Sequence, residues 1–270
     1  MTMKTLAYRL DEDGVATLTL NRPESKNAID PAMADELGDL LAAIRADEKV
    51  RVLLITGAGG AFSAGGDVKA MGQGGPRTPE QRRTGMARYT RICTELLAID
   101  RPVIAAVDGV AFGAGFSIAL MCDIVLVSER ARLCMVFQRI GLIPDMGAFY
   151  TLPRVVGLQR AKELIFSARE VDATEAQRLG IAMEVLPVAD LMPRAQAIAR
   201  SFAGASPVAM SLSKRALQSS LASDLPTMLE IESSGQALAT GSDYAREAVR
   251  RFAAREPAQF RWPAASSDGA

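Results

Sequence analysis

Two short segments that are rich in glycine and alanine are the part of the sequence best suited to chemistry. Residues 57–67 read GAGGAFSAGGD, residues 108–115 read DGVAFGAG, and each segment follows a short apolar run. Main chain without bulky side chains can bring backbone N–H groups close to a ligand oxygen. Two such N–H groups aimed at one point form an oxyanion hole, which stabilises negative charge on a carbonyl oxygen. Either segment alone could instead be a plain turn.

The sequence contains no histidine, which limits the groups that could move protons. Imidazole is thereby excluded as a general base, a metal ligand or a member of a catalytic triad. Acid–base chemistry near neutral pH must come from a carboxylate, a thiol, a tyrosine or a lysine with a shifted pKa. Asp145, in the turn IPDMGA, is one candidate base. The same residue could instead cap a helix that begins at Met146, and the residues alone leave both interpretations open.

The overall composition is that of an ordinary globular protein and excludes several function classes. Of the 270 residues 49% are hydrophobic and 23% are charged, and 31 basic side chains balance 31 acidic ones. A chain without net charge has no bulk field to attract nucleic acid or an anionic membrane. No segment approaches the roughly 20 apolar residues of a membrane span, and the N-terminus has no signal-peptide pattern, so we expect a cytoplasmic protein.

Three cysteines, at positions 93, 122 and 134, are scattered along the chain without the spacing of metal ligands. This usage is typical of buried thiols in a reducing cytoplasm. We therefore expect no metal site.

Short apolar runs alternate with helical patterns over the first half of the chain. Asp30 and Pro31 have the residue types of a helix start, and a periodic apolar face follows them as far as Ile44. The segment 72–88 is rich in Gly, Pro and Arg, and we expect it to be mobile and to lead into a helix through Leu97. Strands are predicted at residues 6–10, 15–20, 51–55, 103–107 and 124–128, and the start of a helix at 113–121. This alternation predicts an α/β core with parallel strands.

The pattern changes after Thr151, where nearly every segment is typical of a helix. The predicted helices cover residues 152–165, 173–179, 191–203, 208–221, 225–238 and 244–255, and one further strand is predicted at 181–186. We divide the chain into a core at residues 1–200, a helical region at 201–262 and a frayed, small and polar tail at 263–270.

Three stretches together resemble the signature segments of the crotonase family, which comprises the enoyl-CoA hydratases and isomerases. They are NRPESKNAID at residues 21–30, FSAGGDVKAM at 62–71 and DGVAFGAGFSIALMCD at 108–123, and the likeness runs from about Leu6 to about Phe260. The resemblance implies a spiral of ββα units followed by a helical region that packs against neighbouring subunits in a trimer or a dimer of trimers. It also implies an acyl-CoA thioester substrate, with no cofactor beyond the CoA of the substrate.

The resemblance also assigns roles to single residues. It places the two oxyanion-hole N–H groups at Ala64 and Ala114. Hydratases of the family use two glutamates, and the matching positions here are Ser117 and Phe137. Neither side chain can exchange a proton at a useful pKa, so the chain is not an ordinary two-glutamate hydratase.

Residues 136–157 resemble instead the isomerase branch, which carries an aspartate in a similar turn, here Asp145. A single carboxylate is enough to move a double bond, because it can remove a proton from C2 of a 3-enoyl thioester and return it at C4. An aspartate with its ordinary pKa of about 3.9 is too weak a base, so we expect burial among Phe112, Phe116 and Phe137 to raise that pKa. With the resemblance, the interpretation of Asp145 as a base is favoured over that of a cap.

The resemblance further implies positions that bind the substrate. The CoA-binding candidates are Lys26, Ala64, Gly66, Asp67, Val68 and Arg255, and the residues expected to line the pocket are Phe112, Ser117 and Phe137. Lys26 and Arg255 could equally be solvated charges, and Asp67 has the type and place of a cap for a short helix at 68–71.

Two other functions stay open. One is a hydratase or other thioester lyase in which Asp145 works with a water. The other, from a different class, is an RNA-associated protein on a crotonase scaffold, although no helix shows the lysine-rich face that such a protein would need.

Overall fold

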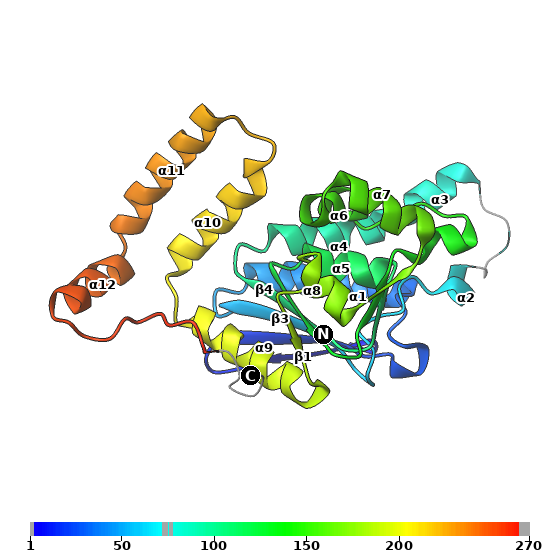
Figure 1. Cartoon of the computed structure of the whole chain (residues 1–270), viewed down its shortest axis with the longest axis horizontal. Coiled ribbons are helices and arrows are strands. Elements are labelled where there is room, and N and C mark those ends of the chain that lie inside the picture. Colours follow the sequence, from blue (N-terminus) through cyan, green and yellow to red (C-terminus); the bar gives the residue numbers. More distant parts are fainter. Residues whose placement is uncertain (1–2, 72–74, 76–77, 265–270) are drawn as a thin grey trace.

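The computed structural model describes residues 3–71, 75 and 78–264 of the chain, which form a body of sheet and helices with a helical arm projecting from one side (Figure 1). The main sheet has the strand order β1-β2-β3-β4-β6-β9. Only β1 and β2 pair antiparallel, and the other neighbours in this sheet are parallel. The strands are β1 (Leu6–Leu10), β2 (Val15–Leu20), β3 (Val52–Gly57), β4 (Val103–Val107), β6 (Ile124–Ser128) and β9 (Glu184–Leu186).

A second, smaller sheet has the order β5-β7-β8. Its strands are β5 (Val110–Phe112), β7 (Arg132–Cys134) and β8 (Glu170–Asp172). β5 pairs parallel with β7, and β7 pairs antiparallel with β8. The sequence did not predict these strands, because segments of three residues are too short to show a period of two.

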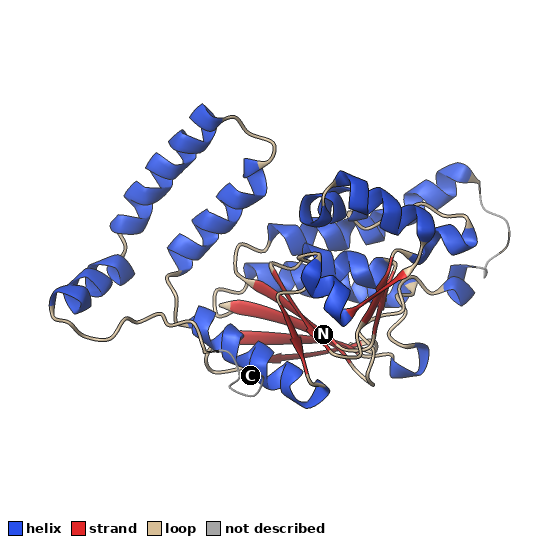
Figure 2. Ribbon diagram, viewed as in Figure 1, coloured by secondary structure: helices blue, strands red, loops and turns tan. Residues whose placement is uncertain are grey.

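Helices cover both faces of the main sheet (Figure 2). Because successive side chains of a strand point to opposite faces, Leu53 and Ile55 belong to the large core that includes α1, α4 and α5, whereas Val52 and Leu54 pack with α9 on the other face. The helices of the body are α1 (Pro31–Ala46), α2 (Val68–Met71), α3 (Pro79–Gly85), α4 (Ala87–Ala98), α5 (Ala114–Met121), α6 (Ala148–Val156), α7 (Leu158–Ser167), α8 (Ala173–Arg178) and α9 (Val188–Ala203), and short 3-10 turns lie at Pro23–Ser25 and Val136–Ile140.

The main strands and the start of the first long helix were predicted correctly. β1, β2, β4 and β6 have the predicted bounds, and the Asp30 carboxylate accepts a hydrogen bond from the Met33 N–H at 2.8 Å, as expected of a helix cap. The single helix predicted at 152–165 is wrong, because Gly157, with a φ of 76°, separates α6 from α7. The segment predicted to be mobile contains α3, and Thr78 and Gln81 form a capping box at the N-terminus of this helix. The rest of that prediction, at residues 72–74, 76 and 77, lies outside the described residues.

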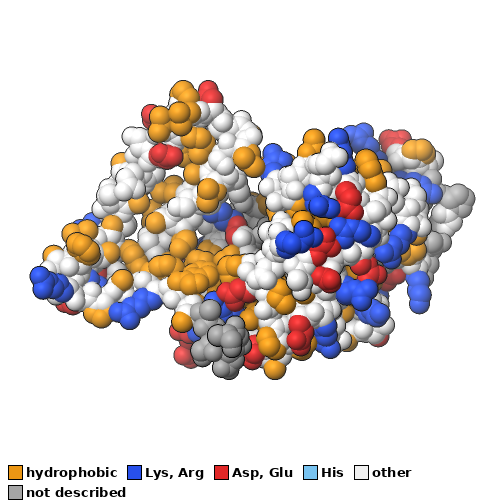
Figure 3. Space-filling view, in the orientation of Figure 1, with side chains coloured by type: hydrophobic (Ala, Val, Ile, Leu, Met, Phe, Trp, Pro, Cys, Tyr) orange, Lys and Arg blue, Asp and Glu red, His pale blue; other side chains and the backbone are white. Residues whose placement is uncertain are grey.

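The arm consists of α10 (Pro207–Ser220), α11 (Leu225–Thr240) and α12 (Asp243–Ala253), and none of the residues in these three helices is buried. Polar contacts attach α10 to the body, where Lys214 Nζ lies 2.7 Å from an Asp123 carboxylate oxygen. A groove of about 700 Å³ runs between α10 and α11 and includes Leu212, Ala216 and Ile231. Figure 3 shows apolar side chains gathered on the arm and in the hollow between the arm and the body.

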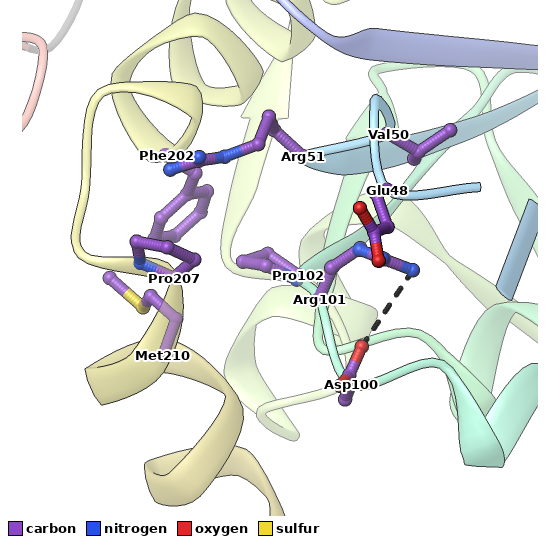
Figure 4. A pocket seen from close by; sticks show the side chains of 9 residues that line it. All are labelled: Glu48, Val50, Arg51, Asp100, Arg101, Pro102, Phe202, Pro207 and Met210. Atoms are coloured by element: carbon purple, nitrogen blue, oxygen red, sulfur yellow. Dashed lines mark ion pairs between the residues drawn. The ribbon is translucent and has the colours of Figure 1, made fainter. Parts of the chain in front are cut away.

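A second cavity, of about 190 Å³, lies where the arm leaves the body (Figure 4). Arg51 donates to the Ala205 carbonyl at 2.9 Å, and Arg101 donates to the Arg45 carbonyl at 2.9 Å. Both guanidinium groups therefore link segments of the chain that are far apart in the sequence. The cavity lies between these linked segments and is a feature of the packing between arm and body. Within the described part of the chain, no helix is both long enough and apolar enough to cross a membrane.

Candidate active site

The two glycine-rich segments lie side by side at the ends of β3 and β4. The Phe62 N–H donates to the Val110 carbonyl at 3.1 Å, and the Phe112 N–H donates to the Ser63 carbonyl at 2.9 Å. This close approach requires glycine at Gly65, since a Cβ there would lie 2.5 Å from the Phe112 carbonyl oxygen and 3.3 Å from the Ala114 nitrogen. The loops are thus held in contact beside the start of α5.

Ala114 has a main-chain N–H without a hydrogen-bond partner among the described residues. It is the first residue of α5, and Gly113 before it takes a φ of 49°. The first N–H groups of a helix have no partner inside the helix and carry its partial positive charge. Ala114 N–H has no hydrogen-bond partner among the described residues. It remains a candidate donor to a substrate oxygen.

The prediction for Ala64 is wrong, because its N–H is already used. It donates to the Lys26 carbonyl at 2.8 Å and so holds the loop against the segment before α1. The sequence could not show this, because the bond joins residues far apart in the chain.

Within the segment 64–67, Gly66 is the residue whose main-chain N–H has no hydrogen-bond partner among the described residues. The Ile29 N–H donates to the Gly65 carbonyl at 2.7 Å, and the Asp67 N–H donates to the Ile29 carbonyl at 3.0 Å. In an extended segment the main-chain groups of successive residues point to opposite edges. Because Gly65 and Asp67 pair with Ile29, the Gly66 N–H points away from Ile29. In the part of the chain that the structure describes it has no partner. The candidate pair of donors is therefore Gly66 and Ala114.

Asp145 is half-buried and has one carboxylate oxygen without a hydrogen-bond partner in the described part of the chain. Its Oδ1 is buried and has no hydrogen-bond partner among the described residues. Burial raises the pKa of Asp145 to about 6, in the direction predicted. The interpretation as a helix cap is wrong: Met146 and Gly147 take φ values of 49° and 76°, α6 begins only at Ala148, and Gly147 stands at the cap position without a side-chain bond. The carboxylate is therefore a candidate base.

The two positions that hold glutamates in hydratases serve other purposes here. The Ser117 hydroxyl is fully buried and lies 3.1 Å from the Asp145 carbonyl oxygen and 3.2 Å from the Gly113 carbonyl oxygen. Phe137 is also buried, and its ring lies 3.5 Å from the place where a Cβ of Gly113 would stand. Phe112 meets the first loop through its main chain. The three residues predicted to line the pocket therefore lie at or beside the start of α5.

Sequence reasoning missed two side chains of α4 that lie near Asp145. Tyr89 and Cys93 are one helical turn apart, and the Cys93 thiol donates to the Tyr89 carbonyl at 3.4 Å. Burial, with a further contribution from the Asp145 charge, raises the pKa of Cys93 to about 11, and burial and the same charge act to raise the pKa of Tyr89. Neither residue belongs to a recognisable motif, so only the packing of α4 reveals them.

The CoA-binding candidates fall into two groups. Lys26, Ala64, Gly66, Asp67 and Val68 lie on or beside the first loop. The Asp67 carboxylate accepts from the Ala70 N–H at 3.1 Å, which confirms the predicted cap of α2, and it is paired with Arg22 at 3.2 Å. Although partial burial opposes it, these hydrogen bonds keep the pKa of Asp67 below its usual value.

Arg255 is separate from this group. It follows α12, and α12 and α2 lie at opposite ends of the molecule (Figure 1). Within one chain the structure does not bring Arg255 to the glycine-rich loops.

Comparison with known proteins gives one consistent family. The family model described as enoyl-CoA hydratase/isomerase matches residues 11–263. The chain is 38% identical over 251 residues to the 1,2-epoxyphenylacetyl-CoA isomerase of Escherichia coli K12, covering 92% of this chain and 95% of that protein. It is 34% identical to a probable enoyl-CoA hydratase of Rhodobacter capsulatus, covering 96% and 99%. The crystal structure of an enoyl-CoA hydratase/isomerase from Cupriavidus metallidurans CH34 is similar, with a TM-score of 0.93, 42% identity and coverage of 98% and 100%.

Proposed function

The chain belongs to the enoyl-CoA hydratase/isomerase family, whose members act on acyl-CoA thioesters, and we propose that it is an enoyl-CoA isomerase with Asp145 as its acid and base. The observation that supports this most is the buried carboxylate oxygen of Asp145, which has no partner in the described part of the chain and a pKa raised to about 6. A base with this pKa is largely ionised at neutral pH and still accepts a proton from carbon far better than an ordinary aspartate.

The proposed reaction moves one proton through Asp145 and forms no covalent bond between the substrate and the protein. The thioester carbonyl oxygen accepts hydrogen bonds from the N–H groups of Gly66 and Ala114. Asp145 removes a proton from C2 of a 3-enoyl-CoA, and the electron pair spreads over C4 and the carbonyl oxygen as a dienolate. The two N–H groups stabilise the charge on that oxygen. The protonated Asp145 then returns the proton at C4, which gives the 2-enoyl isomer. The reaction balances without an oxidant or a cofactor.

The alternative is hydration of a 2-enoyl-CoA, the activity that the names of several relatives state. Hydration needs one group to activate water and another to deliver a proton. The Ser117 hydroxyl donates to main-chain carbonyl oxygens, and Phe137 is apolar, so neither side chain supplies the second proton-transferring group. This absence of a second proton-transferring side chain at those positions favours isomerisation.

The exposed apolar side chains of the arm fit an oligomer better than a monomer. The helices α10, α11 and α12 contain no buried residue, yet they expose many large apolar side chains, such as Leu217, Leu238 and Phe252. Contiguous exposed apolar surface marks a protein–protein interface. We propose that further copies of the chain cover these faces in a homotrimer or a dimer of trimers.

Parallel assays of the purified protein distinguish the two reactions. Samples of 3-hexenoyl-CoA and 2-hexenoyl-CoA are incubated separately with the enzyme, and the products are separated by chromatography. We expect the 3-enoyl thioester to be converted to the 2-enoyl isomer and the 2-enoyl thioester to be hydrated much more slowly. Hydration faster than isomerisation would identify a hydratase with a site of another design.

A further inference from the structure

We infer that Ser117 is a positioning residue for Asp145: its hydroxyl fixes the main chain of the catalytic turn to the helix that carries an oxyanion donor. This inference rests on the proposed function. The hydroxyl is fully buried, and its oxygen lies 3.2 Å from the Gly113 carbonyl oxygen and 3.1 Å from the Asp145 carbonyl oxygen, both of which are acceptors for its hydrogen. Ser117 therefore joins the first turn of α5 to the segment that holds the base.

The carboxylate of Asp145 depends on its main chain for its position. Its Oδ1 has no hydrogen-bond partner in the described part of the chain, and the hydrogen bond that the carboxylate does accept comes from its own main-chain N–H. The next two residues, Met146 and Gly147, both have left-handed φ values. A non-glycine residue in that region is held there only by its surroundings. The place of the carboxylate is thus set by whatever holds this turn.

Ser117 supplies the hydrogen bond that holds the turn to α5. The other hydrogen bonds of the turn are local: the Ala148 N–H donates to the Asp145 carbonyl at 3.1 Å, and Tyr150 and Thr151 donate to the Gly147 carbonyl. These bonds move with the turn. Among the described residues, the Ser117 hydroxyl makes the one hydrogen bond that joins residues 145–147 to α5.

This bond matters because α5 begins at Ala114, one helical turn before Ser117. The separation between the base and the donor of Ala114 is therefore set partly by the Ser117 hydroxyl. A displacement of about 1 Å between reacting groups can lower a rate by about 100-fold. A hydroxyl also makes this link without a second negative charge, which would raise the pKa of Asp145 further.

The test compares Ser117→Ala with Thr56→Val as a matched control. The Thr56 hydroxyl is also buried, and it donates to the Ala106 carbonyl at 3.0 Å on a neighbouring strand. Both variants lose a buried bond from a hydroxyl to a carbonyl, so both should show a similar small fall in Tm. We expect Ser117→Ala alone to lower kcat, by about tenfold, with KM changed by less than about twofold. Ser117→Cys, which keeps a weaker donor of similar size, should have an intermediate kcat and provides the readout if the alanine variant does not fold.

Two results would overturn the inference: a wild-type kcat in Ser117→Ala, or an equal fall of kcat in Thr56→Val. Asp145→Asn is assayed beside them. If that variant isomerises at the wild-type rate, the proposed function itself fails, whatever Ser117 does. If it is inactive while Ser117→Ala is fully active, only the positioning role fails.

Discussion

The hydroxyl of Ser117 lies 3.1 Å from the main-chain carbonyl oxygen of Asp145, although 28 residues separate the two in the chain. Through this contact the helix that begins at Ala114 and the turn that carries the buried carboxylate form one unit. The structure thereby joins the element that carries a candidate base to the element that carries a candidate oxyanion donor.

Ala114→Pro tests the donor at the start of α5. Proline is well tolerated at the first position of a helix, where its missing N–H would have no partner inside the helix. The substitution should therefore remove the donor with little effect on the fold, and kcat should fall by about 100- to 1000-fold. Ala114→Ser is the control, because it also enlarges this buried side chain but keeps the N–H. Equal rates for the two variants would show that the Ala114 N–H does not contact the transition state.

The second donor is tested at Gly66. Gly66→Pro should lower kcat by about 100-fold or more, since it deletes the N–H that points away from the Ile29 segment. Gly66→Ala keeps this N–H and should retain most of the turnover. Circular dichroism of both variants checks that the fold survives. A folded proline variant with normal turnover would contradict the assignment of Gly66.

Because the pKa of Asp145 is raised, we expect the free energy of unfolding to depend on pH through this residue. The pKa of Asp145 is about 6 in the folded protein, whereas an unperturbed aspartate, as in the unfolded chain, has a pKa of 3.8. As the pH rises, the unfolded chain therefore loses this proton before the folded protein does. The contribution of Asp145 to the free energy of unfolding should therefore fall between about pH 4 and pH 7, by up to about 3 kcal/mol. Asp145→Asn cannot titrate, and its advantage in the free energy of unfolding should grow over the same range. Denaturation in urea at about pH 4.5 and pH 8 measures this difference, and a constant difference would contradict the raised pKa.

The arm makes a prediction about assembly. Leu217 and Leu221, four residues apart near the end of α10, are 72% and 70% exposed in the single chain. Replacing both by glutamate should place charges in the proposed subunit interface and shift the protein to monomers, while Leu217→Met should leave the assembly intact. Light scattering at micromolar concentration reads the mass directly. A monomeric wild type would rule out the proposed trimer or hexamer.

Much of the fold was accessible from the sequence because its signals are local. Buried strands such as β4 and β6 are continuous apolar runs between polar ends, and α1 begins at a carboxylate followed by proline. The three strands of the small sheet and the break at Gly157 depend on contacts between distant segments, which no local pattern shows.

The candidate site shows the same division. The two loops and Asp145 were identified from the sequence, but the resemblance to the family predicted Ala64 as a donor. Which N–H of that loop is free depends on pairing with Lys26 and Ile29, and this pairing exists only in the folded chain. The left-handed φ of Met146, because of which Asp145 does not cap α6, could not be predicted either, since a methionine gives no sequence signal for that conformation.

Hydrogen exchange at the substrate measures most directly whether Asp145 transfers the proton. A 3-enoyl-CoA is incubated in D₂O with the wild type or with Asp145→Asn, and mass spectrometry follows the deuterium that enters at C2 and C4. The wild type should exchange the C2 hydrogens and form the 2-enoyl isomer, whereas the folded, CoA-binding Asn variant should do neither, because an amide cannot accept the proton. Exchange and isomerisation by Asp145→Asn at the wild-type rate would contradict the account.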